Sequence, residues 1–294
     1  MARDGPPLRS TPSGQTYLRC RRVHRRITHL GVGTQQVRSY RNLQNNESKL
    51  IAQYLLDEPE KYVAHFERYA ASVVSIIAYG RRIPSYLDPI ITEVIAVMHN
   101  AADLNVPGKT FPMLMETFPL LAKFPNWMAP WKKGLGGRET GKRFFFSLAK
   151  EANDESPNEN FSRQIFELKD KYELNDREIS AISGNLFGAG SDTSASTLVS
   201  FVLAAVMFPE AVQKAQKEID SVVGSDHSPN FEDLLQLPYV EAFVKEVFRW
   251  RSVAIIGGQP HAPVQDDYYG KWFIPKDTWV QGNLWFALHQ SSRD

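Results

Sequence analysis

The chain has 294 residues, which is enough for one large domain or two modest ones. Its composition, 43% hydrophobic and 23% charged, is that of an ordinary globular protein. The net charge is only +1, but residues 1–50 carry ten basic and two acidic residues. A single cysteine, Cys20, excludes an internal disulfide and a metal site built from several cysteines. The first 25 residues contain no apolar core segment, so no secretory signal is predicted.

The N-terminal end divides into a leader and a basic segment. Residues 1–16 are rich in Pro, Gly and Ser, and we predict a flexible leader there. Residues 18–30 are basic with sparse apolar positions, which allows three interpretations. They are the solvated face of a helix, a site for an anion or phosphate (including nucleic acid), and a mitochondrial presequence. No aromatic residue separates the arginines, which argues against binding of single-stranded nucleic acid.

The first half of the remaining chain has the apolar spacing of helices. The spacing predicts helix over 46–80, interrupted by a turn at 57–60, and again over 85–104 and 139–152. Between the last two lies 107–137, which contains five prolines and several aromatic residues. We expect an irregular connector there that acts as a lid, a membrane-facing surface or a plain cover of the core.

The C-terminal third changes from helices to strands. Helices are predicted over 209–224, with Pro at the start and Gly past the end, and over 237–251. Beyond Gly257-Gly258 the runs around 268–280 are rich in β-forming residues. The sequence therefore predicts a mainly α chain with small β-sheets near its end.

The stretch from Asn175 to Pro209 is the longest predicted helix. Asn175 followed by Glu178 has the pattern of a capping box, and Pro209 is a natural stop. Between Glu178 and Glu210 the only charged residue is Asp192. A helix of about 50 Å that is apolar on all sides is expected to lie in the interior. The alternative is a transmembrane span, which the many hydroxyl residues at its centre disfavour.

The middle of this helix breaks the ordinary rules of helix composition. Glycines occur at 184, 188 and 190, although each costs about 1 kcal/mol relative to alanine inside a helix. Hydroxyl side chains at 191, 193 and 194 can bond to the helix's own carbonyls and bend it. Such exceptions concentrated at one place indicate a functional site.

A second candidate feature is the pair Glu246 and Arg249, which share one helix face because they are three residues apart. Their flanking residues are apolar, so the pair is either buried or an ordinary surface ion pair. Together with Ala189–Ser194 in the preceding long helix, the pair resembles the cytochrome P450 family of heme-thiolate monooxygenases. Pro260-His261 and the predicted strand run 273–285 follow in the family's order. The resemblance covers roughly 20–289 and is closest to fungal, microsomal-type members, many of which serve secondary metabolism.

The resemblance implies a large α domain, here an incomplete P450 fold over 17–294, that binds heme b against the long helix. Ala189 and Gly190 would lie against the heme, where glycine lets a flat ring approach the backbone. Asp192 and Thr193 would lie beside bound dioxygen and relay protons. The resemblance assigns no metal ligand to any residue of this sequence. Four further positions receive roles: Arg25 and His261 as propionate contacts, and Glu246 and Arg249 as a structural pair.

The resemblance also implies partners and a location. The family oxidises hydrophobic small molecules with dioxygen and takes electrons from NADPH-cytochrome P450 reductase. Its microsomal members lie on the endoplasmic reticulum membrane; a chain without the family's N-terminal anchor is expected to be cytoplasmic.

Three departures from the family pattern qualify this expectation. Arg21 stands where the family has tryptophan, and residues 1–294 contain neither the family's N-terminal anchor and first sheet nor its axial-cysteine loop. Cys20 lies outside any such loop motif. We therefore expect the chain as written to be inactive and to bind heme weakly or not at all. The alternative functions are a non-catalytic helical scaffold for a hydrophobic ligand or protein partner, and a basic nucleic-acid binder through 19–41.

Overall fold

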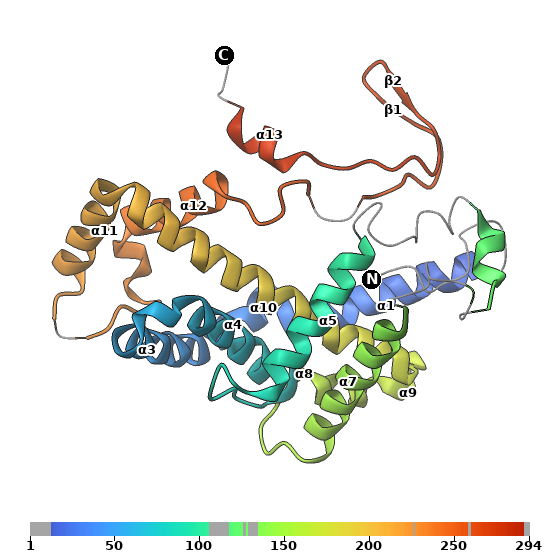
Figure 1. Ribbon diagram of the computed structural model, residues 1–294, viewed down its shortest axis with the longest axis horizontal. Helices are drawn as coiled ribbons and strands as arrows, with labels where there is room; N and C mark the ends of the chain where they lie inside the picture. Colours follow the sequence, from blue (N-terminus) through green and yellow to red (C-terminus); the bar gives the residue numbers. More distant parts are fainter. Residues whose placement is uncertain are drawn as a thin grey trace. The chain divides into compact units, whose positions relative to one another are not determined.

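The computed structural model describes residues 13–105, 118–125, 128, 135–225, 227–257 and 260–290. For 13–21, 99–105, 119, 122 and 135–139 only the backbone is described. The chain divides into two compact units, Met1–Ser194 and Ala195–Asp294. The division falls inside the longest helix, and each unit is described by itself (Figure 1). A single domain over 17–294 stays a prediction.

Unit 1 is built from helices. Its elements are α1 (Ser13–Val32), α2 (Thr34–Ser39), α3 (Arg41–Asp57), η1 (Pro59–Lys61), α4 (Tyr62–Tyr79), α5 (Pro89–Asn105), η2 (Pro119–Lys123), α7 (Leu135–Asp154), α8 (Phe161–Glu167), α9 (Lys169–Tyr172) and the first part of α10 (Asp176–Met207). The helices predicted over 46–80, 85–104 and 139–152 are confirmed, with the break at 57–60 falling between α3 and α4. Of the predicted leader, 13–16 begin α1, and 1–12 lie outside the described residues. The connector 107–137 is described only in part, around η2.

Unit 2 contains the rest of α10 and a small sheet. Its other elements are α11 (Pro209–Val222), η5 (Asp233–Gln236), α12 (Pro238–Trp250), β1 (Asp267–Tyr269), β2 (Trp272–Ile274) and α13 (Leu284–His289). The strands pair antiparallel, with Tyr268 opposite Phe273. Of the predicted strand run 273–285, only Phe273 and Ile274 lie in a strand. Its end is helical, because Asn283 caps α13 by accepting a hydrogen bond from the amide of Phe286 at 2.9 Å.

The start of α10 has the reciprocal caps that its sequence predicts. The amide of Glu178 donates to Asn175 Oδ1 at 3.1 Å, and the amide of Asn175 donates to Glu178 Oε2 at 3.0 Å. Each residue thus satisfies a backbone donor of the other, as in a capping box. The predicted N-terminus of the helix is confirmed.

The three glycines of α10 are packing positions against other helices of unit 1. A side chain on any of them would collide with a neighbour. Close approach of helices requires small residues where their surfaces cross. Each glycine meets a large side chain from a different helix: Phe145 of α7 at Gly184, Met98 of α5 at Gly188, and Val74 of α4 at Gly190.

The expectation that all of α10 lies in the interior is wrong. In unit 1 the helix is buried through Ile179, Ile182 and Phe187. In unit 2 it has few packing partners among the described residues, so Val206 is 75% exposed and Met207 is exposed as well. By length and hydropathy alone, α10 is the one described helix that is able to cross a membrane, a test that core helices of globular proteins also pass.

Buried ions and hydrogen bonds hold the connector between α4 and α5 (80–88). Glu47 of α3 accepts from Arg68 of α4 at 2.9 Å and from Arg82 of the connector at 2.6 Å. Arg68 also donates to the carbonyl of Ile83 at 3.1 Å, while the amide of Ile83 donates to Ser72 at 3.2 Å. Glu47 and Arg68 are fully buried. Because such groups lose their hydration on folding, each depends on the other's charge.

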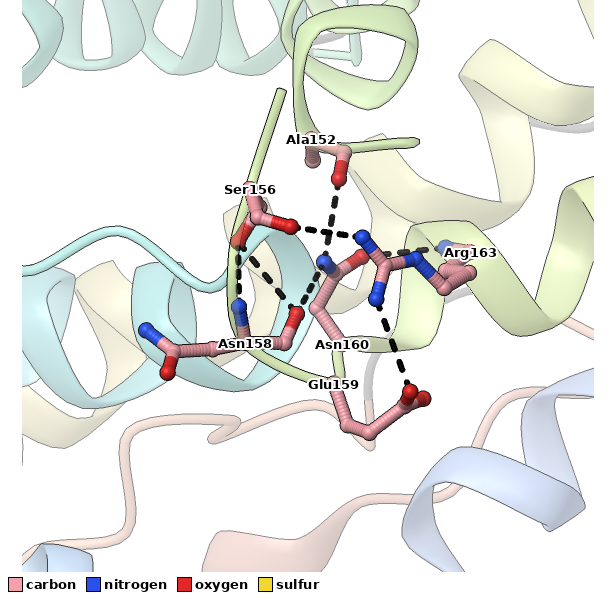
Figure 2. Close-up of polar contacts among 6 residues, drawn as sticks. All are labelled: Ala152, Ser156, Asn158, Glu159, Asn160 and Arg163. Atoms are coloured by element: carbon pink, nitrogen blue, oxygen red, sulfur yellow. Dashed lines mark hydrogen bonds and ion pairs between the residues drawn. The ribbon is translucent and has the colours of Figure 1, made fainter. Parts of the chain in front are cut away.

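A second polar cluster links the end of α7 to the start of α8 (Figure 2). Asn160 accepts a hydrogen bond from the amide of Arg163 at 3.0 Å and donates one to the carbonyl of Ala152 at 3.1 Å. It therefore caps the start of α8 and binds the end of α7. Arg163 Nη2 donates to the carbonyl of Ser156 at 2.6 Å. The hydroxyl of Ser156 lies over Gly80, which ends α4 with a φ of +67°.

Gly80→Ala is expected to lower the free energy of unfolding by more than about 1–2 kcal/mol, which is what a left-handed conformation costs an L-residue. The added Cβ would collide with the hydroxyl of Ser156 and displace the turn in Figure 2. Gly224→Ala is the matched control, since Gly224 also has a φ of +67° but nothing within 4 Å of its Cβ position. Urea unfolding of both variants measures the difference. Equal losses would contradict a role for the contact with Ser156.

Candidate functional site

Three of the predicted site residues lie on one exposed face of α10. Ala189, Asp192 and Thr193 are spaced by three and four residues, so they lie on the same side of the helix. All three are exposed, whereas Phe187 and Ser191 on other faces are buried in unit 1. The face therefore combines a small apolar residue, a carboxylate and a hydroxyl on a fixed backbone.

The hydroxyl of Thr193 is held in place by its own helix. Its Oγ1 donates to the carbonyl of Ala189 at 2.6 Å. This bond uses the hydroxyl proton and fixes the side chain, while the oxygen can still accept hydrogen bonds. The backbone remains helical throughout 176–207, so the hydroxyls do not interrupt the helix.

Gly190 is half-buried and borders this face from the side. Its missing side chain is explained within unit 1 by the contact with Val74 of α4. The close approach of a flat ring, which the sequence suggested for this glycine, is thus not needed to account for it. Its role at a cofactor stays a prediction.

Arg25 lies on α1 in unit 1 and is exposed, with no ion-pair partner among the described residues. Its neighbour His24 points elsewhere: its Nε2 lies 3.6 Å from Glu178 Oε1, at the cap of α10. Burial lowers the pKa of His24, and the carboxylate of Glu178 opposes this effect. Of the two basic side chains, Arg25 is the one available to an anion, whereas His24 joins α1 to α10.

The lowered pKa of His24 predicts a loss of stability in mild acid. The unfolded chain binds the proton at a higher pH than the folded chain, so stability is complete above a pH of about 6.5 and falls as the pH drops toward the folded pKa. Urea unfolding between pH 5 and pH 8, roughly the range in which histidine titrates, measures the slope. His24→Gln is expected to flatten it, whereas the exposed His29→Gln is expected to leave it unchanged. Identical slopes in all three proteins would exclude His24 as the cause.

Glu246 and Arg249 form a two-pronged ion pair on α12. Arg249 Nε and Nη2 donate to the two carboxylate oxygens of Glu246 at 2.7 and 2.6 Å. The side chains are 57% and 41% exposed in unit 2, so the pair is a surface ion pair among the described residues. The hydrogen bonds from Arg249 hold the pKa of Glu246 below its usual range. Arg249 Nη1 also donates to the carbonyl of Leu288 at 3.0 Å, which fixes the end of α13 to α12.

His261 is exposed, and its backbone is fixed in unit 2 by an isolated bridge. Its amide donates to the carbonyl of Val280 at 2.9 Å, and its carbonyl accepts from the amide of Val280 at 2.8 Å. Arg25 and the α10 face thus belong to unit 1, and Glu246, Arg249 and His261 to unit 2. Among the described residues there is no cluster of three or more possible metal ligands.

Sequence reasoning missed the buried network of Glu47, Arg68 and Arg82. The available signal was weak: Arg68 lies on the same face of its predicted helix as apolar residues, where an unpaired charge is not expected. It also missed His289, whose Nδ1 bonds to the carbonyl of Trp285 at 2.9 Å and which contributes to lowering the pKa of Glu246.

The sequence and the fold both match known proteins. The family model for cytochrome P450 matches residues 17–292. Cytochrome P450 monooxygenase 113 of Postia placenta is 33% identical over 97% of this chain and 56% of its own length. Cytochrome P450 monooxygenase polD of Polytolypa hystricis is 34% identical over 97% of this chain and 55% of its own. A zebrafish cytochrome P450 solved with progesterone is 19% identical and shares the fold with a TM-score of 0.70, over 95% of this chain and 64% of that one.

These matches define the class. The chain belongs to the cytochrome P450 family, and it spans about half the length of the curated relatives it matches. The predicted family and the mainly α fold class with a small sheet are confirmed.

Proposed function

We propose that this chain forms the oxygen-facing part of a heme-dependent monooxygenase that inserts oxygen from O2 into a hydrophobic small molecule. The observation that carries the proposal is the exposed α10 face with Ala189, Asp192 and Thr193 at helical spacing. A small residue leaves space beside a planar group, and an acid next to a fixed hydroxyl is suited to proton transfer. The fungal relatives named as monooxygenases support the same reaction class.

The residues present fit heme b in two respects. The α10 face is open in unit 1, and Arg25 is an exposed cation without an ion-pair partner among the described residues, suited to a propionate. Arg25 and His261 would hold the carboxylates of the cofactor, and Ala189 and Gly190 would border its plane. Heme would supply the activation of dioxygen. Asp192 and Thr193 would supply protons, and Glu246 with Arg249 would keep α12 and α13 together.

The partners follow from the proposed reaction. Electrons would come from NADPH-cytochrome P450 reductase, and the substrate would be an apolar small molecule of secondary metabolism. The expected location is the surface of the endoplasmic reticulum membrane. The proposal is tested by expressing the complete reading frame and recording the reduced carbon-monoxide difference spectrum, followed by NADPH-dependent oxidation of apolar compounds with reductase. A thiolate-type band near full occupancy is expected, and a protein purified without heme would overturn the proposal.

A second candidate function is a non-catalytic scaffold that binds a hydrophobic ligand or a protein partner. It is favoured by the exposure of the Glu246–Arg249 pair and of apolar side chains in unit 2, such as Phe248 and Trp285. The same experiment separates the two candidates. A scaffold would bind apolar ligands without heme and would show no NADPH-dependent product.

A further inference from the structure

One face of α4 carries two buried polar side chains that do not belong to the proposed active site. His65 and Arg68 are almost completely buried and lie one helical turn apart. Both contact the ring of Tyr54 on α3: the imidazole stacks on it with centroids 5.5 Å apart, and the guanidinium carbon lies 5.2 Å from its centroid. The two side chains therefore pack against the same tyrosine ring.

The hydrogen bond of His65 fixes which ring nitrogen carries the proton. Its Nε2 lies 3.0 Å from the carbonyl of Glu58, and a carbonyl can only accept, so Nε2 is the donor. In the neutral ring, Nδ1 is then a bare acceptor. This atom is buried and has no hydrogen-bond partner among the residues that the structure describes. A buried acceptor of this kind needs a donor.

Arg68 has the opposite requirement. Its Nη1 donates to Glu47 and to the carbonyl of Ile83. Its Nε and Nη2 are buried donors without a partner among the described residues. These two nitrogens form one edge of the guanidinium fork, an edge that binds a single acceptor atom or an oxygen pair. The site thus offers two donors and, one turn away, one acceptor.

We propose that a single water molecule is bound here, accepting from Arg68 Nε and Nη2 and donating to His65 Nδ1. Water is the ligand that satisfies both requirements with three hydrogen bonds, the usual number for a buried water. A chloride ion is disfavoured because it would be repelled by the lone pair of Nδ1. A cation is disfavoured because it would be repelled by the positive charge of Arg68. The water bridges two residues of α4 where this helix bonds to α3 and to the connector 80–88, and it does not depend on heme binding.

Nuclear magnetic resonance on the full chain tests the proposal. In protein labelled with nitrogen-15 histidine, the shifts of His65 are expected to show Nε2 protonated and Nδ1 as a hydrogen-bonded acceptor. A shift typical of an acceptor without a hydrogen bond, or a protonated Nδ1, would overturn the proposal on the unaltered protein.

A substitution supplies an independent measurement. His65→Gln keeps a donor at the Nε2 position and removes the Nδ1 acceptor. Oxygen-17 relaxation dispersion is expected to show one long-lived internal water fewer than in the parent protein, and the Tm is expected to fall by about 2–4 °C. His29→Gln, at an exposed histidine, is the control and is expected to change neither. An unchanged number of long-lived waters in His65→Gln, or specific chloride binding in its place, would overturn the proposal.

Discussion

Glu47→Gln is expected to lower the free energy of unfolding by about 3–5 kcal/mol, the cost of leaving a buried charge without its counter-ion. Glu47 and Arg68 are both fully buried, and Glu47 is the only carboxylate that bonds to Arg68 among the described residues. Arg82 bonds to the same carboxylate but remains half exposed, so water can solvate it after the change. Arg68 is fully buried, so water cannot solvate it after the change.

The measurement has to report on unit 1. Four of the six tryptophans belong to unit 2, so fluorescence would report mostly on that unit. Urea unfolding followed by circular dichroism, with hydrogen exchange of the α4 amides, is suited to it. Glu159→Gln is the matched control, because Glu159 is 80% exposed in its ion pair with Arg163 and is expected to contribute about 1 kcal/mol or less.

The double variant Glu47→Leu with Arg68→Met tests the physical reason. Replacing both partners by apolar residues removes the unpaired charge together with the ion pair, so most of the lost stability is expected to return. If the double variant is as unstable as Glu47→Gln, the loss comes from packing at these positions and not from an uncompensated charge.

The features that the sequence predicted well depend on residues close together in the chain. The capping box of Asn175 and Glu178 needs only a spacing of three, and the start of α12 at Pro238 needs only the residue itself. The pairing of Glu246 with Arg249 likewise follows from one helical turn. Local signals of this kind can be recognised in the sequence without knowing which helices pack together.

The features that the sequence missed depend on contacts between distant elements. Arg68 finds Glu47 twenty-one residues away, on another helix. The glycines at 184, 188 and 190 look like flexible points of a helix, but each is a contact with a different neighbouring helix. The exposure of the Glu246–Arg249 pair also depends on which elements cover α12. The apolar residues that flank the pair in the sequence do not determine it.

For the candidate site, the sequence predicted which residues share a face but not what holds them. Helical spacing places Ala189, Asp192 and Thr193 together, and the structure adds the bond from Thr193 to the carbonyl of Ala189. This bond gives the threonine oxygen one orientation from which to accept a further hydrogen bond. The role of Asp192 and Thr193 in catalysis remains a proposal that activity measurements can decide.

Asp192→Asn in the complete protein is expected to lower the rate of product formation by about 100-fold, the lower end of the contribution of a positioned acid. The amide side chain of this variant has the size of the carboxylate and leaves the helix intact, but it does not deliver a proton. Thr193→Ala is expected to slow the reaction for the same reason, while more of the NADPH is consumed without product. Product formed and NADPH consumed, measured together at equal heme content, give both effects.

Conservative variants separate proton delivery from a structural effect on α10. Thr193→Ser keeps a hydroxyl that can donate to the Ala189 carbonyl, so it is expected to retain most of the activity lost in Thr193→Ala. Ser194→Ala removes an exposed hydroxyl one residue further along the helix and is expected to leave the ratio of product to NADPH unchanged. If Ser194→Ala uncouples as strongly as Thr193→Ala, the effect belongs to the helix and not to the acid and hydroxyl on its open face.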